Sequence, residues 1–156
     1  MPLYFAYGSN LDCGQMRERC PSARFVCVAK LKDYGLAFTR KSTKRGCGVA
    51  DAVSKTGCDV WGVVYEIDDQ DLAQLDRCEG YHPGKPEKED SYNRRERVVL
   101  DGGDEHKPLT VMTYFAVGEC NPPPPNKQYM GQIIEGAKFW RLPAEYIKEL
   151  ERVEVA

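Results

Sequence analysis

Glu79 is the acidic residue of this chain whose position best suits acid–base chemistry. It follows Leu75 by four residues and Leu72 by seven, so on a helix the three side chains share one face. The helix is expected to end at Gly80, and the C-terminal end of a helix dipole is negative. Partial burial and this dipole both disfavour the carboxylate, so both raise the pKa of Glu79. Such a carboxyl group suits general acid–base catalysis near neutral pH, and the alternative is a partly exposed residue at a helix end.

The Gly-Ser-Asn loop at residues 8–10 is a second candidate for chemistry. An apolar run precedes it, so we expect a buried strand over 2–7, a tight loop, and a helix over 11–19 capped by Ser9 or Asn10. The first N–H groups of a helix have no partner within it, so such a loop can hold an anion or a developing oxyanion. The alternative is a strand, a turn and a helix cap without chemistry, because short Gly-Ser turns are common.

Cys78 and His82 form a rival pair, a thiol nucleophile with a nearby base. If 70–78 is helical, Cys78 lies about 100° from Glu79 around the helix axis, and nothing in the sequence orients His82, so this hypothesis is the weaker one. The seven cysteines show no CxxC spacing, and neither His82 nor His106 clusters with them. The sequence therefore predicts free thiols and no structural metal.

The composition narrows the class of protein. The 156 residues suffice for one domain, spanning 1–156, and 42% hydrophobic with 29% charged residues is typical of a globular protein in water. A net charge of −2 gives no argument for nucleic acid as a partner. No apolar run reaches the length of a membrane span, and the N-terminus lacks a signal-peptide pattern. We therefore expect a cytoplasmic protein with no nucleic-acid or membrane partner.

The remaining pattern places short strands first and helices last. Helices are expected over 70–78, capped by Asp68 or Asp69, over 129–140, and from Pro143 onward. Further strands are expected over 25–29, 34–39, 60–67, 92–100 and 109–117, the last two joined as a hairpin through 101–104. The turns are too brief for parallel crossovers, so we expect an α+β fold with a mainly antiparallel, curled, barrel-like mixed sheet flanked by helices.

Several connecting segments carry predictions of their own. Residues 40–46 include four cations without interleaved aromatic residues, which favours a solvated loop over an anion patch. The glycines within 46–50 indicate a close approach of the backbone to another segment. Residues 54–57 predict a turn, 81–91 a polar loop, and the prolines at 122–125 a stiff, extended connector.

Motifs along nearly the whole chain match a known pattern in order and spacing. They are Tyr4 to Leu11 with its Tyr-Gly-Ser-Asn core, Pro21-Ser22-Ala23, Val60 to Val64, Leu75-Asp76, Glu79-Gly80, Pro125, Tyr129, Gly136-Ala137, and Leu142-Pro143 with Tyr146. Together they resemble the γ-glutamylcyclotransferase family, with its butirosin-biosynthesis-type cyclotransferase fold. Cys47 departs from the paired glycines that relatives usually carry at this point.

The resemblance implies roles for individual residues. In that family the Tyr-Gly-Ser-Asn loop holds the γ-glutamyl moiety, and a glutamate before a glycine is the catalytic acid and base. Glu79 is therefore implied as the catalytic residue. The implied substrate-binding residues are Tyr4, Phe5, Ala6, Tyr7, Gly8, Ser9, Asn10, Tyr92 and Tyr129.

The implied reaction is the intramolecular cyclisation of small γ-glutamyl amino acids or amines to 5-oxoproline, a step of glutathione metabolism. The substrate's own α-amine attacks its γ-carbonyl, so the family requires no Ser or Cys nucleophile, no metal and no organic cofactor. The alternative is a catalytically silent γ-glutamyl-binding or interaction module on the same fold. The sequence leaves open which leaving group is preferred and whether the chain forms a homodimer.

Overall fold

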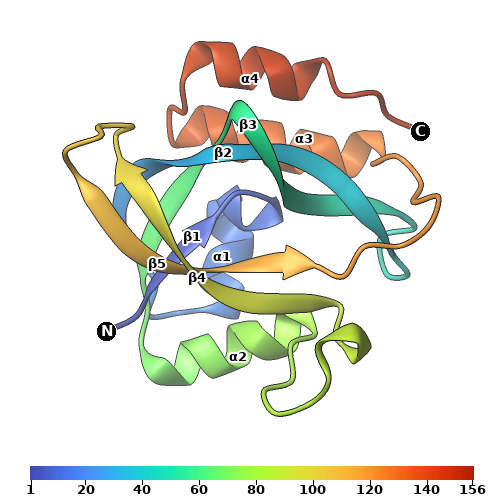
Figure 1. The fold of residues 1–156 in the computed structure, drawn as a ribbon, viewed down its shortest axis with the longest axis horizontal. Coiled ribbons are helices and arrows are strands. Elements are labelled where there is room, and N and C mark those ends of the chain that lie inside the picture. Colours follow the sequence, from blue (N-terminus) through green and yellow to red (C-terminus); the bar gives the residue numbers. More distant parts are fainter.

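A closed five-stranded barrel forms the centre of the computed structural model, which describes residues 1–156 (Figure 1). The strands are β1 (Leu3–Ala6), β2 (Arg24–Ser42), β3 (Cys47–Glu66), β4 (Tyr92–Asp101) and β5 (Pro108–Ala116). Their order around the barrel is β1-β3-β2-β4-β5, and every pairing is antiparallel except that of β1 with β5. The expected α+β fold with a mainly antiparallel, barrel-like mixed sheet is confirmed.

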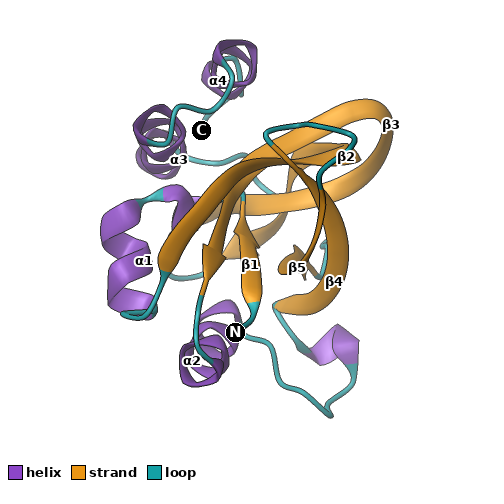
Figure 2. Ribbon diagram, turned by 90° about the vertical axis from the view of Figure 1, so that its left-hand side faces the viewer, coloured by secondary structure: helices purple, strands orange, loops and turns teal.

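Four helices flank the barrel: α1 (Cys13–Arg19), α2 (Asp69–Glu79), α3 (Lys127–Phe139) and α4 (Ala144–Glu151). Short 3-10 turns occur at Ser9–Leu11 and Glu87–Glu89. Figure 2 shows α4 beside α3, and α1 between α3 and α2 along one side of the barrel. None of these helices is long and apolar enough to cross a membrane.

The helix ends follow from local side chains. Asp68 accepts a hydrogen bond from the Asp71 N–H and caps α2, and Gly80, at φ 69°, ends that helix as predicted. The expected cap of α1 is wrong: Asp12, not Ser9 or Asn10, accepts from the Gly14 and Gln15 N–H groups. The reason is that the loop first forms its own 3-10 turn, so the α-helix begins only after it.

Two expected breaks in the sheet are absent. The predicted strands over 25–29 and 34–39 are parts of one strand, β2, and the predicted turn at 54–57 lies within β3. The pairing of β2 with β3 instead shifts register around Asp33, whose φ is 63°. Gly57, at φ 84°, donates its N–H to Asp33 Oδ1 across 3.0 Å. A bulge therefore absorbs the turn residues and bends the strand pair without ending it.

The β2–β3 tip, where β2 ends and β3 begins, is hydrogen-bonded to the proline connector at residues 122–125. β2 runs to Ser42, so the solvated loop predicted over 40–46 shrinks to the last few of these residues. The close approach predicted around Gly48 is confirmed, because a Cβ there would lie 2.0 Å from the carbonyl oxygen of Pro123. Gly48 also donates its N–H to the Pro124 carbonyl across 3.1 Å. The connector is thus held against β3 before it enters α3.

Candidate active site

A cavity opens where β1 runs into the loop at residues 8–10. Its lining comes from the loop, α2, α3 and four of the strands. The lining residues are Tyr4, Tyr7, Gly8, Ser9, Asn10, Ala50, Glu79, Tyr92, Thr113, Tyr114 and Tyr129. The structure therefore brings together the residues expected at the site, with the exceptions of Phe5 and Ala6.

Phe5 and Ala6 belong to the core rather than to the cavity lining. Both are fully buried against Gly62 of β3, whose missing side chain leaves room for the Phe5 ring and the Ala6 carbonyl. Successive side chains of a strand point to opposite faces, so Phe5 faces away from the side that Tyr4 occupies. The Phe5 carbonyl still accepts a hydrogen bond from Thr113 Oγ1 across 2.8 Å, which fixes one wall of the cavity.

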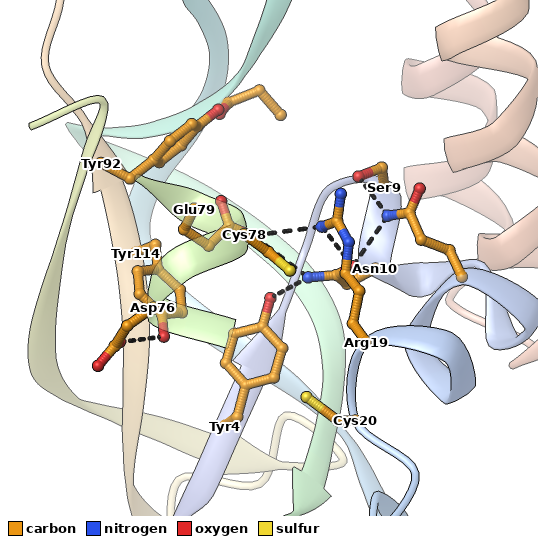
Figure 3. Close-up of polar contacts among 12 residues, drawn as sticks. Tyr4, Ser9, Asn10, Arg19, Cys20, Asp76, Cys78, Glu79, Tyr92 and Tyr114 are labelled. Carbon is orange, nitrogen blue, oxygen red and sulfur yellow. Dashed lines mark hydrogen bonds and ion pairs between the residues drawn. The ribbon is translucent and has the colours of Figure 1, made fainter. Parts of the chain in front are cut away.

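The Glu79 carboxyl group faces Asn10 from the last turn of α2 (Figure 3). Glu79 Oε1 accepts a hydrogen bond from Asn10 Nδ2 across 3.3 Å and lies 3.7 Å from Arg19 Nη1. Burial raises the pKa of Glu79, and it outweighs the lowering effects of the Arg19 and Arg45 charges and of the Asn10 hydrogen bond. The pKa of this carboxyl group is therefore shifted in the direction that favours general acid–base catalysis.

Asn10 connects the loop at residues 8–10 to neighbouring strands and helices through further hydrogen bonds. Its Nδ2 also donates to Tyr4 Oη across 2.9 Å, and its Oδ1 accepts from Gln15 Nε2 at 2.9 Å and Arg19 Nη1 at 3.0 Å. Its backbone carbonyl accepts from Tyr65 Oη across 3.1 Å. Only 3% of Asn10 is exposed, so these bonds satisfy a buried amide and hold the loop in one conformation.

Helix α3 packs against Leu11, the residue that follows the loop at residues 8–10. A Cβ at Gly136 would lie 2.6 Å from the backbone carbon of Leu11, so only glycine permits this approach. One turn later, Trp140 Nε1 donates to the Leu11 carbonyl across 3.0 Å. The motif around Gly136 thus has a packing role in the site.

Ala50 contributes its backbone, which the sequence did not point out as a functional group. Its N–H donates to Tyr129 Oη across 2.9 Å, and its carbonyl accepts from Tyr92 Oη across 2.6 Å. The glycines just before Ala50 were the one available signal, since they indicated a close backbone approach. Burial raises the pKa of both tyrosines, and likewise of Tyr4 and Tyr7. These hydroxyl groups therefore stay protonated at neutral pH, and Glu79 is the lining group that can exchange protons there.

The family model described as gamma-glutamyl cyclotransferase, AIG2-like, matches residues 4–141 of this chain. The chain belongs to the γ-glutamylcyclotransferase family. It is 35% identical over 159 residues to the gamma-glutamylcyclotransferase of Homo sapiens, a match that covers 97% of this chain and 78% of the human protein. The Bos taurus gamma-glutamylcyclotransferase is 36% identical over 156 residues with the same coverage.

A solved structure titled gamma-glutamyl cyclotransferase agrees in fold with this γ-glutamylcyclotransferase family member. The two superpose with a TM-score of 0.88 at 34% identity, over 99% of this chain and 89% of the other. The resemblance drawn from the sequence motifs is thereby confirmed.

Tyr114 and Asp76 extend the site of this γ-glutamylcyclotransferase family member beyond the expected residues. Tyr114 Oη donates to Asp76 Oδ1 across 2.6 Å, and the buried Asp76 carboxylate pairs with Arg94 Nη1 at 2.7 Å. Tyr7 in turn donates its hydroxyl to the Tyr114 carbonyl. Asp76 precedes Glu79 by three residues, so one face of α2 supplies both the candidate acid and the group that orients Tyr114.

The rival thiol site finds no support in the geometry. The Cys78 side chain is exposed, and its sulfur contacts Gln74 Nε2 at 3.8 Å rather than a base. His82 is oriented, contrary to expectation, because Asp90 Oδ1 lies 2.8 Å from its Nδ1. All seven cysteines are free, as predicted, and the chain holds no group of three or more His, Cys, Asp or Glu side chains that could bind a metal ion. Cys47 is buried and does not line the cavity.

Proposed function

We propose that residues 1–156 act as one γ-glutamylcyclotransferase unit, converting small γ-glutamyl amino acids or amines to 5-oxoproline. Relatives that carry this name are 35–36% identical over nearly the whole chain. The observation that carries the proposal is the half-buried Glu79 carboxyl, which meets the loop at Asn10 inside one cavity. The Tyr7-Gly8-Ser9-Asn10 loop and the hydroxyl groups of Tyr4, Tyr92 and Tyr129 are the groups that we assign to binding the γ-glutamyl moiety.

The cyclisation needs a group that accepts protons from the substrate and gives them back within the same catalytic cycle. The substrate's α-nitrogen forms a bond to its γ-carbonyl carbon, and the bond from that carbon to the leaving nitrogen breaks. In all, the α-ammonium group gives up two protons and the leaving nitrogen gains two. Glu79, as a carboxylate, accepts each of the two protons in turn from the α-nitrogen and passes it to the leaving nitrogen, so the enzyme regains its starting state.

The cavity supplies orientation and charge stabilisation. Because nucleophile and electrophile belong to one molecule, holding the γ-glutamyl chain bent places the two reacting atoms in contact. The developing oxyanion needs nearby donors, and we assign the backbone N–H groups around Gly8, Ser9 and Asn10 to this role. The hydrogen bonds that lock Asn10 fix these donors before substrate arrives.

The cellular setting follows the same proposal. All seven cysteines are free, and free thiols persist in reducing compartments. We therefore propose a cytoplasmic enzyme whose partner is a small γ-glutamyl compound, rather than nucleic acid or a membrane.

A panel of γ-glutamyl dipeptides and γ-glutamyl amines tests the function. Purified protein is incubated with each compound, and 5-oxoproline and the released amine are measured by mass spectrometry. Release of both products in equal amounts supports the proposal. Binding without turnover across the whole panel would instead indicate the catalytically silent γ-glutamyl-binding module.

A further inference from the structure

A polar groove leads outward from the cavity across α1, α3 and the β2–β3 tip. It shares Ser9, Glu79, Tyr92 and Tyr129 with the cavity, so the two spaces are continuous. With the γ-glutamyl part in the cavity, the leaving group must extend into this groove. The side chains of the groove therefore select the leaving group, which the residues of the cavity alone do not determine.

Arg45 is a cation of the groove that lies directly against the lining of the cavity. Its guanidinium carbon lies 4.9 Å from the centre of the Tyr129 ring, at the boundary between groove and cavity. Its Nη1 donates to Gln132 Oε1 across 3.0 Å, and its Nη2 donates to Gln15 Oε1 across 3.1 Å. Both partners are neutral amides, and no carboxylate forms an ion pair with Arg45. Arg19, by contrast, already faces Glu79.

The two glutamines tie Arg45 to the substrate loop. Gln132 Nε2 donates to Asp12 Oδ2 and to Gln15 Oε1, both across 2.9 Å. Gln15 Nε2 donates to Ser9 Oγ across 2.8 Å and also reaches Asn10 Oδ1. The guanidinium group is thus fixed relative to the cavity, and three of its five N–H donors remain available to a ligand.

We infer that Arg45 binds the α-carboxylate of the leaving amino acid and is thereby a residue that sets the leaving-group specificity of this site. The inference rests on the proposed function. A guanidinium group suits this task because it forms paired, charge-assisted hydrogen bonds with a carboxylate. Lys41 and Lys44, the neighbouring lysines of the groove, are exposed and so offer only a mobile, solvated charge. Asp12, an acid of the groove, is occupied by Gln132 and by the first N–H groups of α1.

A matched pair of substrates tests this role. γ-Glutamylalanine and γ-glutamylethylamine differ only by the carboxylate of the leaving group. For Arg45→Gln, kcat/KM on γ-glutamylalanine should fall about 10- to 100-fold, the usual contribution of a hydrogen-bonded charge. The loss should appear mainly in KM, and kcat/KM on γ-glutamylethylamine should fall by clearly less, because its leaving group has no carboxylate for Arg45 to bind. Lys107→Gln is the control, since Lys107 is exposed and lines neither the cavity nor the groove, and it should leave both substrates unaffected.

Equal losses on both substrates, or no loss on either, would overturn the inference. A separate binding measurement distinguishes this from a failure of the proposed reaction. By calorimetry, Glu79→Gln protein should bind γ-glutamylalanine about 10-fold or more tightly than the Glu79→Gln, Arg45→Gln double variant. If the wild-type protein makes no 5-oxoproline but this difference is found, the reaction is wrong and the carboxylate site stands. Equal binding by the two proteins contradicts the site whatever the turnover.

Discussion

Asn10 Nδ2 donates a hydrogen bond to Glu79 Oε1 across 3.3 Å, although 69 positions separate the two residues in the chain. The contact joins the loop after β1 to the last turn of α2, so both halves of the candidate site meet at one buried amide. Neither half suffices for the proposed reaction alone: the loop lacks a proton-transfer group, and Glu79 by itself does not bind the substrate.

Replacing Asn10 with Ala should impair both stability and activity. The change removes one hydrogen bond each from Tyr4, Gln15 and Arg19, which should lower the free energy of unfolding by about 1–3 kcal/mol. Urea denaturation measures this loss, and kcat/KM should fall with it. Asn93→Ala is the control, since it removes a buried amide that bonds the Glu87 carbonyl outside the cavity. It should lower stability but spare kcat/KM, and equal activity of the two variants would contradict the role of Asn10.

Glu79→Gln should make the protein more stable at high pH. Burial raises the pKa of Glu79 above its ordinary 4.5, so this group stabilises the fold only while it is protonated. That contribution is complete below pH 4.5 and is lost as pH rises through the raised pKa. The neutral glutamine does not have this loss. Thermal unfolding should therefore give a higher Tm for Glu79→Gln than for the wild type at about pH 8 and no difference at about pH 4. A lower Tm at pH 8 would contradict the raised pKa.

The acidic limb of the pH–activity profile should respond to Arg19. The Arg19 charge lowers the pKa of Glu79, in opposition to burial, so Arg19→Gln should move the limb of kcat/KM to higher pH. Arg17 lies on the same helix but is exposed, which makes Arg17→Gln the matched control with an unmoved limb. Identical limbs in both variants would show that the limb does not report Glu79.

Two glycines of α3 should behave in opposite ways. Gly136→Ala places a Cβ 2.6 Å from the Leu11 backbone, so it should displace the loop that precedes α1 and destabilise the protein by about 1–3 kcal/mol. Gly131→Ala meets nothing within 4 Å and should stabilise α3 by up to about 1 kcal/mol, because alanine favours the helix. Urea denaturation of the two variants measures both effects, and a neutral Gly136→Ala would contradict the close packing.

Much of the fold could be predicted from the sequence because it depends on residues that lie close together in the chain. The cap of α2 at Asp68, its end at Gly80 and the inward spacing of Glu79 each depend on residues within one helix. The prediction of a turn over 54–57 is wrong because the structure of this segment depends on its partner strand. Gly57 has the conformation of a turn residue, but the partner strand takes it up as a bulge, and this depends on the register with Asp33.

The candidate site likewise combines local motifs, which the sequence predicts, with contacts between distant segments, which it does not. The loop and Glu79 are short motifs, whereas the Ala50 backbone, Tyr114 and Arg45 join the site only through pairings between distant segments. The basic stretch around Arg45 reads as a solvated loop because its partners, Gln15 and Gln132, lie far away in sequence. No pattern within this stretch could indicate that the Arg45 guanidinium group is held beside the cavity.

The rate of 5-oxoproline formation by Glu79→Gln tests the central claim most directly. Wild-type protein given a γ-glutamyl dipeptide should release 5-oxoproline and the free amino acid in equal amounts. Glu79→Gln, with an unchanged circular dichroism spectrum and retained ligand binding, should be slower by about 100-fold or more, since general acid–base catalysis contributes that much. If Glu79→Gln keeps the wild-type rate, Glu79 does not transfer the proton, and the account of this site is wrong.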